Sequence, residues 1–392
     1  MVYSGKFGDS KNVKHVSHTD VPGGGQVVVQ GNYAFIGYMA PPIGTTILDI
    51  SDPSKPRIVS QIKLPKGTHS HKVRVAGDIM VVNFESLGVS TVHAGHIPME
   101  GFEGGIKIYN ISDLENPKEI SFYKVGGSGV HRFDFDGKYV YLSAEVDGYL
   151  GNIVMILDLS NPVRPKEVSR WWLPGQWIAG GEKPTWYGRT HRVHHPLRSG
   201  NRLYVSYWHA GFVILDISDI SKPSLVSQLG WSPPYAAPTH TVLRIPHRIM
   251  DRDFLVVTDE REVFDSPQLR ESPPQPNAFV WMVDVTDERR PIPVSTYQVT
   301  TDEKFDSDVW FGAHQSQEKV YDNILCFTWF RAGLRIVDIS NPYVPTEVGY
   351  YIPFPGKGEK VPQTNDVFVD EKRRIYIIDR LCGFDILEFQ GD

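Results

Sequence analysis

Histidine is the residue type whose spacing in this chain could do chemistry. One stretch, THSHKVRVAG at residues 68–77, returns in altered form along the 392-residue sequence. When the seven copies are aligned, one position near the start of the stretch holds histidine in most of them. Two copies carry Gln26 and Asn365 at that position instead. The other five copies carry a histidine there: His71, His131, His191, His240 and His314. Neutral imidazole is a ligand for zinc, copper, iron and nickel, so several of these side chains together would hold a metal ion.

A second repeated phrase indicates which elements carry the histidines. TTILDISDPSKPRIVSQIKLP at residues 45–65 is one copy, and LRIVDISNPYVPTEVGYYIP at residues 334–353 is another. Each copy is an apolar run, a turn rich in Asp, Asn, Ser and Pro, and a second alternating run, which predicts strand, turn and strand. With the histidine strand and the strand after it, the unit has four strands. It recurs every 45 to 65 residues or so, about the spacing of propeller blades.

These repeats predict an all-β chain that folds as one seven-bladed β-propeller domain over residues 1–392. The last blade, residues 360–389, ends without a fourth strand, and residues 11–21 resemble the missing one. We therefore expect the N-terminal segment to be the outer strand of the last blade and to close the ring. Closure would remove a free sheet edge.

The strand motifs ILDIS, IVDIS and MVDVT, with the turns DPSKP and NPYVP, resemble those of the LVIVD-repeat proteins, a propeller family. The resemblance covers nearly the whole chain. It implies the propeller fold and assigns no activity. The family's usual acidic residue just before the first valine of the histidine strand is kept only at Asp366. The repeated histidines, which lie next to this acidic position, are where the chain departs from the family pattern.

Charge and composition exclude several classes of protein. The formal net charge of −6 argues against nucleic acid or an anionic membrane as a partner. Two cysteines in so long a chain argue against a disulfide framework and for a reducing compartment. We see no signal peptide and no apolar run of about 18 residues. We therefore expect a cytoplasmic protein that binds a small-molecule substrate; its oligomeric state stays open.

The long connections in the repeat pattern are expected on one face. They are residues 87–105, 175–189, 260–277 and 300–313, and each would lie on the side where the histidine strands begin. Loops on a rigid scaffold commonly carry function. The histidines and these loops should therefore share one mouth of the propeller channel.

Residues at the strand ends are further candidates. Glu85, Glu145 and Glu260 could move a proton as general acid or base, although salt bridges at loop bases would use them equally well. Arg331 and Arg380 could hold an anionic substrate or form surface ion pairs. The candidates for an aromatic wall of the substrate site, which could equally fill gaps between blades, are Trp208, Trp310 and Trp329.

The remaining histidines are weaker candidates for metal ligands. His69 is a reserve ligand near the expected mouth. We expect His194 and His195, which follow the start of a histidine strand, to lie toward the other face. The histidines expected in loops or at the surface are His93, His96, His194, His195, His209 and His247.

The sequence thus predicts a metal-dependent enzyme that hydrolyses or cleaves a small acidic or aromatic compound. Its cofactor would be one divalent ion, zinc, iron or manganese, bound by some of the five repeated histidines. One alternative is an iron or copper oxidoreductase with the same site. Another is a non-catalytic interaction scaffold, in which the repeated histidines are structural, as in WD-repeat propellers. That arrangement needs a regular acidic partner in each blade, which the sequence lacks.

Overall fold

The protein is built almost wholly from antiparallel β-strands, as the sequence predicted. The computed structural model describes residues 6–91, 95–186, 191–232, 235, 237–260, 278–301 and 310–391, without the side chains of residues 89–97. Within these ranges the one helical element is a short 3-10 helix, η1 (Ile178–Gly180). No helix among them is long and apolar enough to cross a membrane. Cys326 and Cys382 are buried free thiols.

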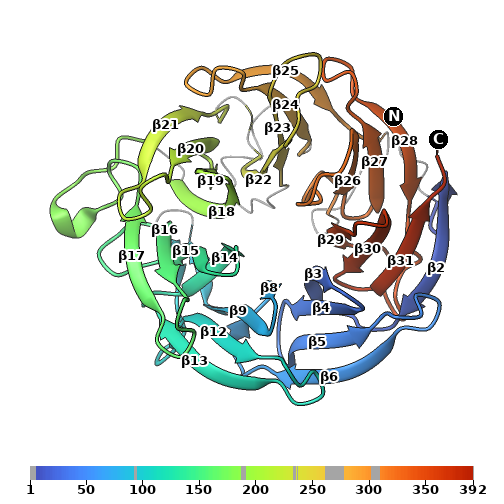
Figure 1. Ribbon diagram of the computed structural model, residues 1–392, viewed down its shortest axis with the longest axis horizontal. Coiled ribbons are helices and arrows are strands. Elements are labelled where there is room, and N and C mark those ends of the chain that lie inside the picture. Colours follow the sequence, from blue (N-terminus) through green and yellow to red (C-terminus); the bar gives the residue numbers. More distant parts are fainter. Residues whose placement is uncertain are drawn as a thin grey trace. The chain divides into compact units, whose positions relative to one another are not determined.

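The chain divides into two compact units, which we call the central unit (Gly25–Gln228) and the terminal unit (Met1–Gly24 with Leu229–Asp392). In the central unit the strands form antiparallel groups in chain order: β3-β4-β5-β6, β8-β9-β12-β13, β14-β15-β16-β17 and β18-β19-β20-β21 (Figure 1). Their bounds are β3 (Gly24–Gln30), β4 (Tyr33–Tyr38), β5 (Ile43–Asp49), β6 (Arg57–Lys63), β7 (Thr68–His69), β8 (Val73–Ala76), β9 (Ile79–Ser86), β10 (Val89–Thr91), β11 (Gly95–Ile97), β12 (Gly105–Asn110), β13 (Lys118–Lys124), β14 (Gly129–Phe135), β15 (Tyr139–Glu145), β16 (Asn152–Asp158), β17 (Lys166–Trp171), β18 (His191–Ser199), β19 (Arg202–Trp208), β20 (Phe212–Asp216) and β21 (Ser224–Leu229).

The terminal unit repeats the same antiparallel plan. Its groups are β22-β23-β24-β25, β26-β27-β28 with β1 beside β28, and β29-β30-β31 with β2 beside β31. The predicted strand at His314 forms only an isolated bridge, between Ser316 and Phe327. The bounds are β1 (Ser10–Lys11), β2 (Val13–Thr19), β22 (Thr239–Arg244), β23 (Phe254–Asp259), β24 (Val280–Asp284), β25 (Ile292–Tyr297), β26 (Ile324–Thr328), β27 (Leu334–Asp338), β28 (Thr346–Tyr351), β29 (Thr364–Val369), β30 (Arg374–Asp379) and β31 (Gly383–Phe389).

The ILDIS phrase folds as its residue types predict. The aspartate at the end of the strand accepts a hydrogen bond from the backbone N–H two residues on. The Asp49 carboxylate accepts from Ser51 at 2.9 Å, and Asp338 accepts from Ser340 at 2.7 Å. The side chain thereby closes the turn that leads into the last strand of each group.

A serine in the last strand of a group binds the next group in the chain. In the central unit the Ser121 hydroxyl donates to the Pro162 carbonyl at 2.6 Å. In the terminal unit Ser295 donates to the Pro342 carbonyl, also at 2.6 Å. Each bond joins a last strand to the ILDIS-type turn of the following group, so the repeat specifies contacts between groups as well as strands within them.

The first strand of several groups is irregular at the repeated histidine. In β14 the pairing shifts between Val130 and Phe133, which leaves His131 and Arg132 outside the regular ladder. In β22 and β29 the shifts leave out His240 and Asn365 in the same way. A bulge of this kind bends the strand and re-aims its side chains. The repeated position is therefore one where the side chain does not follow the strand's alternation.

Strand β9 connects two groups of the central unit. Residues 79–84 pair with β12 inside the second group. At its end, Glu85 is opposite Gly129 of β14, the first strand of the third group. The short strand β7 also pairs there, with His69 opposite Glu85. The end of β9 thus carries a carboxylate to a point where three strands meet.

The segment that holds His71 packs unusually closely on two glycines. A Cβ atom on Gly37 would lie 2.7 Å from the carbonyl carbon of His71, and one on Gly25 would lie 2.4 Å from the Cβ of His71. Real Cβ atoms do not approach so closely, so these positions need glycine to admit the His71 backbone. This contact fixes where His71 lies.

Strand β2 is held on β31 by hydrogen bonds as well as by pairing. The ladder runs from Val13 opposite Phe389 to Thr19 opposite Phe384, and Figure 1 shows the blue β2 alongside the dark red β31. Two histidines of β2 contact the buried Asp385 of β31: Nε2 of His15 at 2.8 Å and Nδ1 of His18 at 2.9 Å from Oδ1.

These contacts change the titration of Asp385 and His18. The hydrogen bond to Asp385 raises the pKa of His18 above its ordinary value, against the opposing effect of burial. Burial opposes ionisation of Asp385, but the bonds from His15 and His18 outweigh it and lower the pKa of that carboxyl. The contact of His18 with Asp385 therefore stabilises the fold fully below the ordinary histidine pKa of about 6.5 and is lost as the pH rises through the raised value.

We predict that Asp385→Asn lowers the pKa of His18, because the neutral amide no longer favours the imidazolium form. An NMR titration of the histidine ring protons measures this directly, with His247, which bonds to Asn323, as the internal control. In the unaltered protein, a His18 pKa at or below about 6.5 would contradict the prediction.

Candidate functional site

Three histidines and one glutamate converge in the central unit. Donor atoms of His69, His71, Glu85 and His131 all lie within 4.8 Å of one another. We call this group the central cluster. His69 ends β7, Glu85 is at the end of β9, His131 is in the bulge of β14, and His71 lies between β7 and β8. Metal–ligand bonds of about 2.0–2.2 Å place neighbouring donor atoms roughly 3–3.5 Å apart, so the cluster has the dimensions to hold one ion after small adjustments.

Hydrogen bonds fix the orientation of two of these imidazoles. Nδ1 of His69 lies 2.7 Å from the carbonyl oxygen of Met39, which can only accept, so Nδ1–H donates and neutral His69 keeps its lone pair on Nε2. That Nε2 is 3.9 Å from Oε2 of Glu85. Nδ1 of His131 is 2.7 Å from the same oxygen. A carboxylate against a histidine nitrogen is the usual support for a metal-binding imidazole.

His71 is the most deeply placed member of the central cluster. Its side chain is 2% exposed, and its Nδ1 is buried with no hydrogen-bond partner among the described residues. Its ring centre is 4.2 Å from that of His69 and 4.9 Å from that of His131. Burial lowers the pKa of His71 well below its usual value, and the nearby charges of His69, His131, Arg132 and Lys72 lower it further. A buried, neutral nitrogen without a partner is what a metal ion would use.

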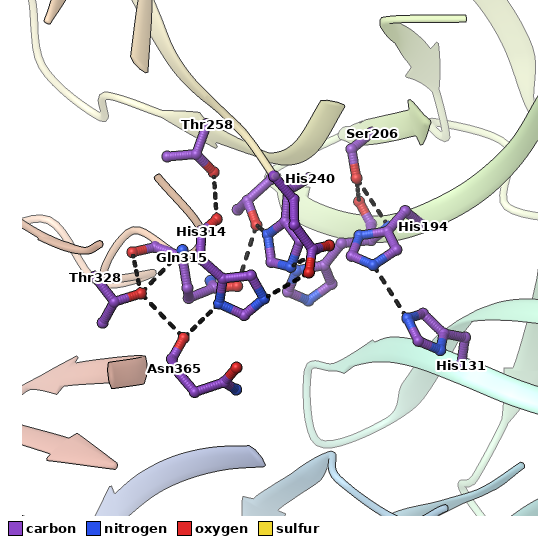
Figure 2. A network of polar contacts seen from close by, with 12 residues as sticks. His131, His194, Ser206, His240, Thr258, His314, Gln315, Thr328 and Asn365 are labelled. Atoms are coloured by element: carbon purple, nitrogen blue, oxygen red, sulfur yellow. Dashed lines mark hydrogen bonds and ion pairs between the residues drawn. The ribbon is translucent and has the colours of Figure 1, made fainter. Parts of the chain in front are cut away.

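His194 extends the central cluster and was misplaced by sequence reasoning. Its Nε2 is 3.1 Å from Nε2 of His131 (Figure 2). The centre of its ring lies 4.6 Å from that of Trp208. The sequence predicts His194, His195 and His209 in loops or at the surface, but all three are buried, at 1%, 0% and 6% exposure. The expectation was wrong because the pairing of β18 shifts between His191 and His195, so alternation does not tell which way these side chains face. His93 and the side chain of His96 lie outside the described residues.

The repeated His191 lies apart from the central cluster. Its ring stacks on Trp186, with centres 4.4 Å apart. Burial lowers the pKa of His191 to about 4, with a smaller effect from His209. Glu145, a predicted acid or base, also lies outside the four-residue cluster, at the end of β15, where it accepts a hydrogen bond from the Ser128 hydroxyl.

The terminal unit holds a second pair of repeated histidines on a carboxylate. Nε2 of His240 is 3.8 Å from Oε2 of Glu260, and Nε2 of His314 is 3.5 Å from its Oε1. Nδ1 of His314 donates to the Asn365 carbonyl at 2.5 Å, and Nδ1 of His240 lies 2.7 Å from the Thr241 hydroxyl (Figure 2). Both imidazoles thus direct Nε2 toward Glu260.

The predicted substrate residues have different surroundings. Arg380 lies over Trp310 and Phe330, at 5.0 and 5.2 Å from the ring centres. Arg331 lies over Phe7 at 5.5 Å. Trp329 is fully buried and packs edge-on against Tyr297. Trp208, in the central unit, lies under the Arg192 guanidinium at 4.5 Å.

The structure therefore groups four of the five repeated histidines, two in each unit, and leaves His191 apart. His71 and His131 share the central cluster with His69, and His240 pairs with His314 in the terminal unit. Beyond the repeat, sequence reasoning gave His69 only a reserve role and missed Asn365 as a support for His314. The signal for His69 was its place two residues before His71.

Solved structures of similar fold share little sequence with this chain. A streptogramin B lyase matches with a TM-score of 0.54 at 11% identity over 96% of this chain and 97% of its own. The periplasmic gluconolactonase of Pseudomonas aeruginosa matches with 0.57 at 12% identity, covering 86% and 87%. A putative 6-phosphogluconolactonase from Bacteroides uniformis matches with 0.59 at 9% identity, covering 87% and 89%. These likenesses support a propeller fold.

Sequence comparison supports the repeat itself. A search of curated proteins finds no match. The LVIVD repeat model matches residues 24–63, 135–171, 198–229 and 318–352. These stretches contain the ILDIS-type strands β5, β16, β20 and β27 with the strands beside them. The chain therefore carries LVIVD repeats at four places, as its strand motifs predicted.

Proposed function

We propose that this protein is a metal-dependent hydrolase or lyase, with one divalent ion held in the central cluster. The observation that carries the proposal is the convergence of His69, His71, Glu85 and His131 on one point of the central unit. Three protein ligands with an open position are the usual arrangement of a catalytic zinc site. The three histidines would supply the ligands and leave room for a water molecule or substrate.

A purely structural role explains this cluster less well. The centres of the His69, His71 and His131 rings lie between 4.2 and 6.1 Å apart. Protonation of one ring is opposed by its neighbours, and Glu85 is the one carboxylate of the group. Neutral imidazoles gain little by facing one another, whereas a cation would give His71, whose buried Nδ1 has no hydrogen-bond partner among the described residues, a group to bind.

Glu85 is the residue placed to move a proton. A metal ion would supply a polarised carbonyl or a water of lowered pKa. The Glu85 carboxylate lies 2.7 Å from His131 and 3.9 Å from His69, so it is held at the edge of the ligand set. From there it can orient His131 and accept a proton from a bound water.

The similar structures favour bond cleavage as the reaction class. Two are lactonases and one is a lyase by name. Their identities of 9–12% make this support for a class and not for a substrate. We propose a small organic substrate, acidic or aromatic, with a carbonyl for the ion to polarise.

We also propose that the strand groups are the blades of a seven-bladed propeller, closed by the N-terminal segment in a single domain. The pairing of β2 with β31 supports closure, because it supplies the outer strand that the C-terminal group lacks. Deleting residues 1–20 should then lower the melting temperature, because β31 would lose its partner β2 and keep an open edge. Unchanged thermal unfolding would contradict this arrangement.

Elemental analysis tests the metal centre first. Protein purified without a histidine tag or chelator should contain close to one equivalent of metal, and His71→Ala and His131→Ala should each lose most of it, because each removes a ligand. His247→Ala is the matched control, since His247 bonds Asn323 away from the cluster. Zinc or manganese would support hydrolysis or lysis, and iron or copper the oxidoreductase alternative. No metal, and none taken up on titration, would overturn the proposal.

Activity tests the role of Glu85. On a panel of lactones and aryl esters followed with a pH indicator, Glu85→Gln should lower kcat by about 100-fold or more, because the amide cannot accept a proton. Its metal content should fall little if the histidines are the main ligands. Glu119→Gln, which removes a surface partner of Lys107, should leave kcat unchanged. Equal kcat for Glu85→Gln and the unaltered enzyme would exclude Glu85 as the base.

A further inference from the structure

Arg380 in the terminal unit is a positively charged side chain that lies within ion-pairing distance of no carboxylate among the described residues. It is half-buried, and it forms no ion pair with the described residues. The buried Arg335 of the same unit shows the usual arrangement, with Glu347 at 3.4 Å. We infer that Arg380 binds the carboxylate of a small monocarboxylic acid through its two Nη groups, which we call the fork. This site is additional to the proposed metal centre.

One nitrogen of the guanidinium, Nε, already donates a hydrogen bond within the protein. Nε of Arg380 donates to the side-chain oxygen of Asn365 at 2.7 Å. Asn365 is itself held in place, because its backbone carbonyl accepts from Nδ1 of His314 at 2.5 Å and from the Thr328 hydroxyl at 3.0 Å (Figure 2). The two Nη groups make no hydrogen bond with the described residues, so the end of the fork is available to a ligand.

Aromatic rings restrict the guanidinium further. Its carbon lies 5.0 Å from the centre of the Trp310 ring and 5.2 Å from that of Phe330. The two rings meet edge to face, with centres 5.1 Å apart. Arginine stacks on such rings and keeps its hydrogen-bonding edge free. The side chain is thus oriented before a ligand arrives, which reduces the entropy lost on binding.

The surroundings favour a monocarboxylate over other anions. A planar carboxylate accepts two parallel hydrogen bonds from the ends of a guanidinium. The negative charge of Glu260 acts on Arg380 from beyond ion-pairing distance and would repel a dianion such as phosphate more than a monoanion. Trp310 is partly exposed and offers apolar surface beside the fork, so an aromatic acid fits better than acetate; Phe330 is fully buried and only supports the guanidinium. Burial lowers the pKa of Arg380, and the charges of Glu260 and Asp379 offset this only in part.

The test is calorimetric titration of the purified full-length protein with benzoate. We expect saturable binding, weakened about tenfold or more by Arg380→Gln, because charge-assisted hydrogen bonds to the carboxylate are lost. Arg380→Lys, which keeps the charge without the fork, should also weaken binding. Arg373→Gln is the matched control, since Arg373 is an exposed partner of Asp322 at 3.0 Å and its loss should change affinity less than about twofold.

Three outcomes would overturn the inference. They are no binding of benzoate by the unaltered protein, equal binding by Arg380→Gln, and tighter binding of inorganic phosphate than of benzoate. Metal content is measured on the same samples. Loss of benzoate binding with metal retained supports the fork and leaves the metal centre intact, so failure of one proposal is distinguishable from failure of the other.

Discussion

The candidate sites depend on one constraint, the break in regular pairing at the start of the first strand of a group. In β14, β22 and β29 the ladder skips the repeated position, which is His131, His240 or Asn365. A residue in a bulge is free of the alternation that otherwise directs side chains to one face or the other. The same backbone device therefore presents a different side chain in each group, and the chemistry changes while the strand pairing does not.

Hydrogen bonds to fixed oxygens turn these side chains into usable ligands. His69 donates Nδ1–H to the Met39 carbonyl, and His314 donates to the Asn365 carbonyl. Each bond settles which nitrogen carries the proton and leaves Nε2 directed at a carboxylate, Glu85 or Glu260. An imidazole with a fixed tautomer and a fixed direction binds a cation without having to reorient.

The repeat supplies the scaffold, and departures from it supply the chemistry. Ser121 and Ser295 make equivalent bonds to the following group, and Asp49 and Asp338 close equivalent turns. At the bulge, by contrast, asparagine replaces histidine in the last copy, where Asn365 orients Arg380 instead of offering a ligand. A structural histidine would be expected to make the same contact in every copy, whereas these side chains contact different partners.

Much of this could be predicted from the sequence. Alternating apolar runs and Asp-Ser-Pro turns determine the strands and their antiparallel order, and the ILDIS phrases identify the repeat family. The spacing also identified His71, His131, His240 and His314 as special. Only the tertiary structure decided which of them meet, that His69 and the buried His194 join His131, and that Arg380 lies against Asn365 and two aromatic rings. The physical reason is that a bulge of one residue reverses the direction of the side chains beyond it without changing the alternating pattern from which strands are predicted.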